Sequence, residues 1–319
     1  MSFDHDRIRK LMTYRYDPGT ASPRPKRHHI HQFRDKEFTD GHLAELFHEN
    51  TKFTEDSHVL DIWSVSLFVV DETMQLIQGD RRNDYPGYER IDLPAPEREL
   101  GIDLGASLSR RRSQRVYDGA PISLQELSTL LGTGLGISGT LHSDATQNPV
   151  RAYPSGGGLY PVEIYVAVIN GDSELDEGLY YYVAEEHALR ILDEDVTDVI
   201  DDAFIPPEQM DPKESAICLL FTGAFWRTYT KYGPRGYRFV LQESGHIGQN
   251  VQLVADALGY GSVPIAAVQE RQIEEMLGIN GVDEALIYSM FVGSPQQTPN
   301  AQPSQKQPDA QLAGGDDHE

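Results

Sequence analysis

A glycine-rich turn that leads into an apolar strand is the part of this chain best suited to hold a ligand. The turn covers residues 154–158 and includes Gly156, Gly157 and Gly158, and a run rich in valine, isoleucine and tyrosine follows at 162–166. Residues without a Cβ let a flat or anionic group lie against backbone amides, and the strand would hold the turn rigid. A triple glycine is also common in ordinary tight turns. The pattern alone therefore leaves a cofactor-binding turn and a plain turn as alternatives.

Four arginines gather between Arg110 and Arg115 in a chain that is otherwise strongly acidic. Guanidinium groups bind phosphate through paired hydrogen bonds, and the hydroxyl of Ser113 could add a neutral one. The other interpretation is a solvated basic turn. The formal net charge is −23, with 50 acidic against 27 basic side chains. Because this basic segment is an exception to that charge, the sequence favours an anion-binding role for it.

Residues 243–258 give the clearest helix in the sequence, with apolar side chains on one face and Gly259 as its C-terminal stop. The first turns of this helix carry Gly245 and Gly248, and each glycine costs about 1 kcal/mol of helix propensity. That loss indicates the close approach of another backbone or of a ligand, and both explanations stay open at this point.

Other patterns in the sequence are weaker candidates for a binding or catalytic site. Residues 134–139 match the GxGxxG dinucleotide motif, but they follow a helix instead of a strand, so we interpret them as a helix-terminating loop. His28, His29 and His31 have no neighbouring ligands that would complete a metal shell, and we expect no metal site. Cys218 lies in an apolar run and is expected to be a buried thiol. The sequence also lacks GxSxG and GxxxxGK[ST] motifs, which argues against an α/β-hydrolase or a P-loop nucleotidase.

Composition narrows the classes of partner. An acidic surface repels nucleic acid and anionic membranes, so we expect neither as a partner. The chain has seven lysines, and an acid excess with few lysines fits a halophilic protein. The most apolar window, at 62–70, is too short to cross a bilayer, and the N-terminal residues lack the apolar region of a signal peptide. A cytoplasmic protein is therefore expected.

The chain is expected to divide into three parts. Residues 1–95 form a polar arm with a short helical and strand segment, 96–294 form the compact domain, and 295–319 form a disordered tail. In the domain, a capping box at Ser123 opens a helix that ends at Gly132. The other expected elements are a helix near 42–48 and a strand at 63–70 in the arm, a hairpin of 179–183 and 188–192, strands at 216–221, 263–268 and 286–292, and helices at 225–232 and 273–277.

In the order and spacing of its motifs, the chain resembles the FMN-dependent nitroreductase superfamily, and within it the SagB-type dehydrogenases of azole-forming peptide modification. The resemblance covers about residues 104–293, and the stretch 47–52 is similar to the same branch. The matching motifs are Arg112-Ser113-x-Arg115, Arg151-x-x-Pro154-Ser155-Gly156-Gly157-Gly158-Leu159-Tyr160-Pro161-x-Glu163, Gly178-Leu179-Tyr180, Lys231-Tyr232-Gly233-x-Arg235-x-Tyr237-Arg238, Glu243-x-Gly245-His246-x-x-Gln249-Asn250 and Gly259-x-Gly261-Ser262.

This resemblance implies an α+β, nitroreductase-like fold with a mainly antiparallel central sheet flanked by helices. It also implies an intertwined homodimer with FMN at the dimer interface. The implied cofactor-binding residues are Arg112, Ser113 and Arg115 for the flavin phosphate and ribityl chain, Pro154, Ser155, Gly156 and Gly158 for one side of the ring, Pro264, Ile265 and Ala266 for its N5 edge, and Gln249 near the interface.

The sequence departs from the general family pattern at two places. Many nitroreductases have an asparagine where Gly158 stands, and a basic residue follows their last strand where this chain has Gly-Ser-Pro-Gln at 293–296. A second phosphate ligand would then come from Arg235 or Arg238.

Lys231 and Tyr232 are the implied catalytic pair, because a Lys-Tyr pair at this place is implicated in substrate oxidation in the SagB-type branch. A lysine and a phenol beside a flavin can remove or relay the proton that accompanies hydride loss. The alternative is structural: Tyr232 would pack in the core and Lys231 would pair with an acid.

The resemblance implies oxidation of a peptide-derived azoline or similar unit by hydride transfer to FMN, with a cyclodehydratase as a possible partner. A second hypothesis is an NAD(P)H-dependent nitroreductase or quinone reductase, in which hydride passes the other way. A third, from another class, is a flavin-binding or scaffold protein without turnover.

Overall fold

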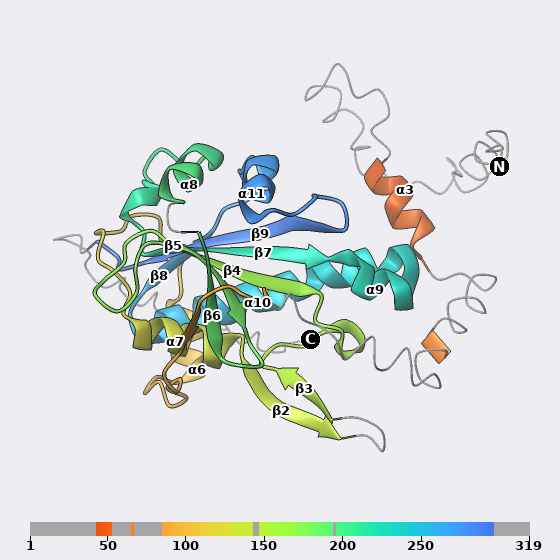
Figure 1. Cartoon of the computed structure of the whole chain (residues 1–319), viewed down its shortest axis with the longest axis horizontal. Coiled ribbons are helices and arrows are strands. Elements are labelled where there is room, and N and C mark those ends of the chain that lie inside the picture. Colours follow the sequence, from red (N-terminus) through yellow and green to blue (C-terminus); the bar gives the residue numbers. More distant parts are fainter. Residues whose placement is uncertain (1–42, 53–64, 67–84, 143–146, 194–195, 297–319) are drawn as a thin grey trace, which may run out of the picture. The chain divides into compact units, whose positions relative to one another are not determined.

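The computed structural model describes residues 43–52, 65–66, 85–142, 147–193 and 196–296 (Figure 1). The chain divides into two compact units, 1–53 and 54–319. Helix α3 (Leu43–Asn50) belongs to the first unit and confirms the helix expected near 42–48. The expected strand at 63–70 lies outside the described residues, except for Val65 and Ser66, which are helical. Most of the tail expected to be disordered, 297–319, also lies outside them.

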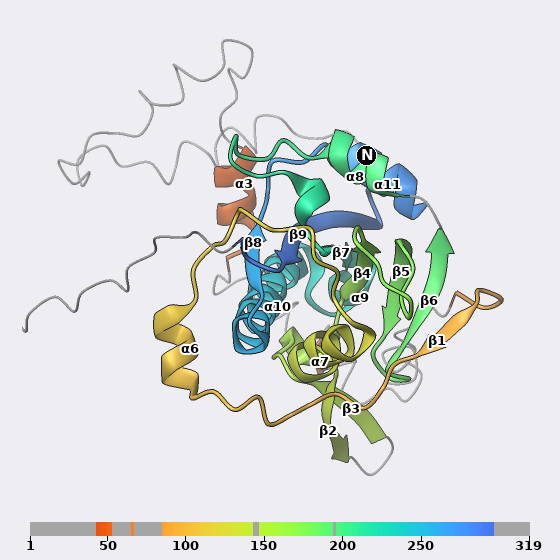
Figure 2. The same ribbon diagram turned by 90° about the vertical axis from the view of Figure 1, so that its left-hand side faces the viewer.

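A seven-stranded sheet forms the centre of the second unit, in the order β1-β6-β5-β4-β7-β9-β8 (Figures 1 and 2). Each pair of neighbours is antiparallel. The strands are β1 (Arg90–Asp92), β4 (Val162–Val168), β5 (Gly178–Val183), β6 (Ala188–Asp193), β7 (Ile217–Ala224), β8 (Gly261–Pro264) and β9 (Glu284–Gly293). Strands β2 (Ile137–His142) and β3 (Gln147–Arg151) pair separately as a two-stranded ribbon.

Helices cover both faces of the sheet (Figure 2). Helices α7 (Leu124–Gly134) and α10 (Gly236–Leu258) cover one face, and α8 (Thr197–Ala203) and α11 (Glu270–Leu277) cover the other. Helix α6 (Leu104–Arg110) packs against α10, and α9 (Phe225–Tyr232) follows β7 and also packs against α10. Side chains at alternate strand positions face opposite sides. Ile164 and Val166 of β4 accordingly join the core under α7 and α10, whereas Tyr165 and Ala167 join the core under α8 and α11. The α+β fold with an antiparallel sheet between helices is confirmed.

Several local expectations are also confirmed. The hairpin is β5 and β6, with Val183 opposite Ala188. Helix α9 has the expected bounds, 225–232. The capping box is present: the Ser123 side chain accepts the Glu126 amide, and Glu126 accepts the Ser123 amide. Cys218 is fully buried. Residues 134–139 follow the expectation only in part: Gly134 ends α7, and residues 137–139 belong to β2 instead of a loop.

Other boundaries differ from the expectation. Helix α10 begins at Gly236 instead of residue 243, because burial of Val240 against the sheet outweighs the weak helix propensity of the aromatic and β-branched residues there. Helix α7 continues past Gly132 to Gly134. Strand β8 ends at Pro264 instead of residue 268, since the chain beyond it leaves β9 and bridges Phe204 through Val268.

The two glycines at the start of the long helix have different surroundings. A Cβ at Gly248 would lie 2.6 Å from the Tyr288 ring of β9, so close packing of α10 on the sheet explains this glycine. Gly245 is exposed, with nothing within 4 Å of the position of a Cβ. Within the described residues, no helix has the length and apolar character that would span a membrane.

The capping box gives a direct test of the packing of α7. Replacing Ser123 with alanine removes the side-chain acceptor for the Glu126 amide, and we expect the free energy of unfolding to fall by about 1 kcal/mol. Urea denaturation would measure the change. Ser173→Ala, at an exposed serine in a loop, is the control and should stay within about 0.5 kcal/mol of the parent. Equal stability of S123A and the parent would show that the box does not stabilise the domain.

Candidate active site

The glycine turn is a short 3-10 turn, Gly156–Gly158, that is closed at both ends by Ser155. The Ser155 carbonyl accepts the Gly158 amide at 3.0 Å, and its Oγ accepts the Tyr160 amide at 2.8 Å. Gly157 and Gly158 have φ angles of +69° and +66°, a left-handed conformation in which a side chain is strained. The position of a Cβ at Gly158 has nothing within 4 Å, so the backbone there is open to a ligand.

Helix α9 places Lys231 and Tyr232 against this turn. A Cβ at Gly157 would overlap the Tyr232 hydroxyl and would lie 3.1 Å from Lys231 Nζ. The Tyr232 ring packs edge-on against Phe239 of α10, with centroids 4.8 Å apart. A Cβ at Gly156 would lie 3.2 Å from the same phenylalanine. The fold therefore brings together the glycine turn and the Lys-Tyr pair, which the sequence separates by more than seventy residues.

Burial shifts the pKa values of Lys231 and Tyr232 in opposite directions. Lys231 is 9% exposed, and desolvation lowers the pKa of its ammonium. Desolvation raises the pKa of the half-buried Tyr232 phenol. Both shifts follow from the cost of placing a charge away from water. The amine of Lys231 is thus neutral at lower pH than an exposed lysine, and Tyr232 keeps its proton.

A buried ion pair lies behind the turn. Arg227 of α9 pairs with Glu163 of β4, and both side chains are almost fully buried. Arg227 Nη1 also donates to the Tyr160 carbonyl at 3.1 Å, and the Tyr181 hydroxyl donates to Glu163 at 2.6 Å. Removal of one partner of such a pair typically costs about 3–5 kcal/mol, because the other charge stays buried and uncompensated. Arg227 was not among the residues predicted from the sequence, although an arginine between aromatic residues in a short helix was an available signal.

A second buried arginine completes this layer. Arg151 donates to the Tyr153 hydroxyl at 2.9 Å and to Glu185 at 3.3 Å, and its backbone amide donates to the Tyr160 hydroxyl at 3.0 Å. Glu243 of α10 is 1% exposed, and burial raises its pKa to about 7. Arg151, Glu163, Arg227 and Glu243 together form a buried, charged layer near the glycine turn, which we call the charged floor.

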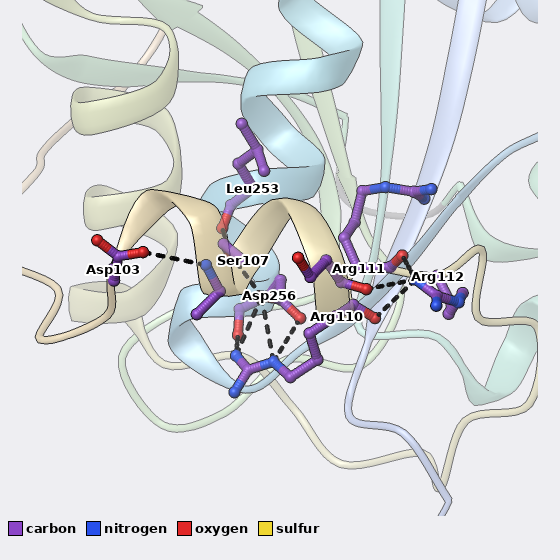
Figure 3. A network of polar contacts seen from close by, with 9 residues as sticks. Asp103, Ser107, Arg110, Arg111, Arg112, Leu253 and Asp256 are labelled. Atoms are coloured by element: carbon purple, nitrogen blue, oxygen red, sulfur yellow. Dashed lines mark hydrogen bonds and ion pairs between the residues drawn. The ribbon is translucent and has the colours of Figure 1, made fainter. Parts of the chain in front are cut away.

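The basic segment lies at a different place, next to the C-terminal end of α10 (Figure 3). Arg110 pairs with Asp256 at 3.0 Å, so this arginine serves the contact between α6 and α10. Arg112 Nη1 donates to the carbonyls of Ser109 and Arg111, each at 2.8 Å, and thereby caps α6. The Arg112 side chain is exposed.

Ser113 and Arg115 follow along the edge of the sheet. Ser113 forms a parallel bridge with Ser262 of β8, and Arg115, which is exposed, donates to the Ser113 carbonyl at 3.3 Å. The loop after β8 carries Ile265, which is buried, and Ala266, which is exposed. The implied phosphate ligands and the implied N5-edge segment therefore belong to one region.

Within one chain, α10 separates these two groups of residues. Glu243 and Phe239 lie at the glycine turn, whereas Asp256 lies at the basic segment. Asp256 lies thirteen positions after Glu243, which corresponds to about 20 Å along the helix. Arg235, at the start of α10, also lies on the side of the glycine turn, 5.9 Å from the Phe239 ring. Gln249 is exposed between the two ends.

Among residues 43–52, 65–66, 85–142, 147–193 and 196–296, histidine, cysteine and acidic side chains do not form a group of three that could hold a metal. The histidine cluster at 28–31 lies outside these residues.

Comparison with curated proteins gives relatives in two groups. A protein of Methanocaldococcus jannaschii named as a nitroreductase is 37% identical over 192 residues, which is 60% of this chain and 91% of that protein. The trifolitoxin-processing protein TfxB of Rhizobium leguminosarum is 27% identical over 54% of this chain. The microcin B17-processing protein McbC of Escherichia coli is 26% identical over 45% of it. The chain spans about half the length of these two, 47% of TfxB and 54% of McbC.

Solved structures share the fold, and a family profile covers most of the sheet. A nitroreductase from Anabaena variabilis superposes with a TM-score of 0.56 and 25% identity, over 68% of this chain and 43% of that one. A chain of the E. coli microcin synthetase McbBCD complex gives 0.52 and 20%, over 87% of this chain and all of that one. The profile described as the nitroreductase family matches residues 108–294, more than half of the chain. The chain belongs to the nitroreductase family.

Proposed function

We propose that this protein is an FMN-dependent oxidoreductase of the SagB type, which oxidises a peptide-derived azoline or a similar substrate. The observation that carries the proposal is the contact of Lys231 and Tyr232 with Gly157 of the glycine turn. The relatives named for processing trifolitoxin and microcin B17 support a peptide substrate. The similar chain in the microcin synthetase McbBCD complex supports a partner in a peptide-modifying complex, for example a cyclodehydratase.

The donors of this chain fit FMN. Arg112 and Arg115 are exposed cations on either side of the Ser113 hydroxyl, which is the donor set that a phosphate requires. The open backbone at Gly158 suits the face of a planar ring. Bound FMN would supply a hydride acceptor, which no amino-acid side chain provides.

A homodimer would bring the two halves of the site together. In one chain, the arginines and the glycine turn lie at opposite ends of α10. Large apolar side chains are exposed on the helices near both ends: Leu104 and Leu108 on α6, Trp226 and Tyr229 on α9, and Leu241 on α10. Exposed apolar groups of this kind mark protein contacts, and we propose that the basic segment of one subunit faces the glycine turn of the other.

Lys231 and Tyr232 have complementary tasks in the proposed reaction. Oxidation of an azoline ring removes a hydride from one ring atom and a proton from its neighbour. The lowered pKa of Lys231 makes its neutral amine available to accept that proton. The raised pKa of Tyr232 keeps the hydroxyl protonated, so it can donate a hydrogen bond to a ring heteroatom. The pair thus orients the substrate and takes up the proton.

The arginine substitutions test cofactor binding. Arg112→Ala and Arg115→Ala should each weaken FMN retention by roughly 10- to 100-fold, because a charged hydrogen bond to phosphate contributes about 1.5–3 kcal/mol. FMN fluorescence titration would give the dissociation constants. Arg271→Ala, at an exposed arginine on α11, removes the same charge elsewhere and should bind FMN as the parent does. Unchanged FMN affinity in the double variant R112A/R115A would remove these arginines from the site.

A matched pair of glycines tests the packing of the Lys-Tyr pair without any cofactor. Gly157→Ala and Gly158→Ala carry the same left-handed strain, but only the first also collides with Tyr232 and approaches Lys231. The free energy of unfolding should therefore fall by about 1–3 kcal/mol more for G157A than for G158A. Denaturant unfolding of both variants measures the difference. Equal losses would mean that the pair does not pack on the turn.

Substitutions in the pair test catalysis. Lys231→Ala and Tyr232→Phe should slow flavin reduction by a thiazoline-containing peptide by roughly 10²–10⁴-fold, while FMN stays bound. In the parent the reduction rate should rise with pH as Lys231 loses its proton, and K231A should lose this rise. Lys213→Ala, at a surface lysine that pairs with Asp201, is the control. Stopped-flow absorbance of the flavin measures the reduction rate.

Reduction rates near that of the parent in both variants would assign the Lys-Tyr pair a structural role. Rapid reduction by NADPH but not by the peptide would favour the nitroreductase hypothesis.

A further inference from the structure

Glu243 is a buried acid directly under the glycine turn. It projects from the inner face of α10 and is 1% exposed. Neither of its carboxylate oxygens has a partner within hydrogen-bond geometry. The Ser155 hydroxyl and the backbone at Val162 lie near enough to lower its pKa, but burial outweighs them and raises the pKa to about 7. This acid is therefore shielded from solvent and lies near Ser155 of the turn.

The charges around Glu243 leave it without a cation of its own. Arg151 of β3 and Arg227 of α9 both lie near enough to lower its pKa. Arg227 is already paired with Glu163, and Arg151 is already bonded to Glu185. The Tyr153 phenol adds no positive charge. Its own pKa is raised by burial, and Glu243 adds to this rise. Three carboxyl groups thus share two guanidinium groups, and the neutral acid is the form of Glu243 that this floor accommodates best.

Ser155 connects Glu243 to the shape of the turn. Its carbonyl and its hydroxyl oxygen each accept a backbone amide of the turn, from Gly158 and Tyr160. The hydroxyl hydrogen remains to be donated in a third direction, and Glu243 lies near it. A change in the protonation of Glu243 therefore affects Ser155, whose hydrogen bonds close both ends of the turn.

We propose that Glu243 is a positioning residue, which as the neutral acid holds Ser155 and the glycine turn in the shape that receives the cofactor ring. Ionisation of Glu243 would place an uncompensated charge in the floor, and the turn would shift to admit water to it. The cofactor part of this inference rests on the proposed function, but the effect on the turn does not.

The first measurement uses the holoenzyme and FMN. In the parent, the FMN dissociation constant should rise by about 10- to 100-fold between pH 7 and 9, because each unit above the pKa reduces the neutral form tenfold. Glu243→Gln keeps the shape of the neutral acid and cannot ionise, so its dissociation constant should lack this rise. The same rise in E243Q and in the parent would overturn the proposal.

The second measurement uses the protein without FMN, so that it stands even if FMN is not the cofactor. Because the pKa of Glu243 is higher in the folded chain than in the unfolded chain, the folded state binds more protons between about pH 4.5 and 7. The stability of the parent relative to E243Q should therefore fall as pH rises through this window and be constant above it. Parallel stability curves for the two proteins would overturn the proposal.

A third variant keeps the test decisive if E243Q does not fold. Glu185→Gln removes the carboxylate that occupies Arg151, and this arginine would then be available to Glu243. The pH midpoint for FMN binding, and for the stability change in the absence of FMN, should therefore move to lower pH. A midpoint that stays in place or moves up would contradict the charge balance on which the proposal depends.

Discussion

The buried pair between Arg227 and Glu163 is the interaction on which the candidate site depends. It joins the first turn of α9 to the central strand β4, and Arg227 also holds the Tyr160 carbonyl just after the glycine turn. Lys231 lies four residues beyond Arg227, on the same face of the helix. The ion pair therefore fixes which face of α9 meets the turn, and it is why Lys231 and not an exposed neighbour such as Tyr229 lies beside Gly157.

This arrangement places the candidate catalytic and binding groups on a buried, charged layer. Arg151, Glu163, Arg227 and Glu243 are all buried, and each charge constrains the others because little water screens them. At the other end of α10, Arg112 and Arg115 are exposed to solvent and donate to nearby backbone carbonyls instead of to buried acids. The single chain thus carries a buried half and an exposed half, and the proposed dimer joins one of each in every site.

The sequence was a good guide wherever the structure is decided locally. The capping box at Ser123, the αL stop at Gly259 and the hairpin 179–193 depend on contacts within a few residues, and all are present. Boundaries set by distant packing were less accurate: α10 begins at Gly236 because the sheet buries Val240, and β8 stops at Pro264 because the chain leaves its partner strand. Propensity carries no information about such partners.

The sequence by itself determined which motifs the candidate site contains. The tertiary structure decided which of these residues lie next to one another. The motifs identified the glycine turn, the Lys-Tyr pair and the basic segment, because unusual residue types at fixed spacing are visible in one dimension. Only the fold showed that Tyr232 lies against Gly157, that Arg227 and Glu243 belong to the floor, and that the basic segment and the turn lie at opposite ends of α10. Contacts between residues far apart in the chain arise from the packing of whole helices on a sheet, and no local pattern records them.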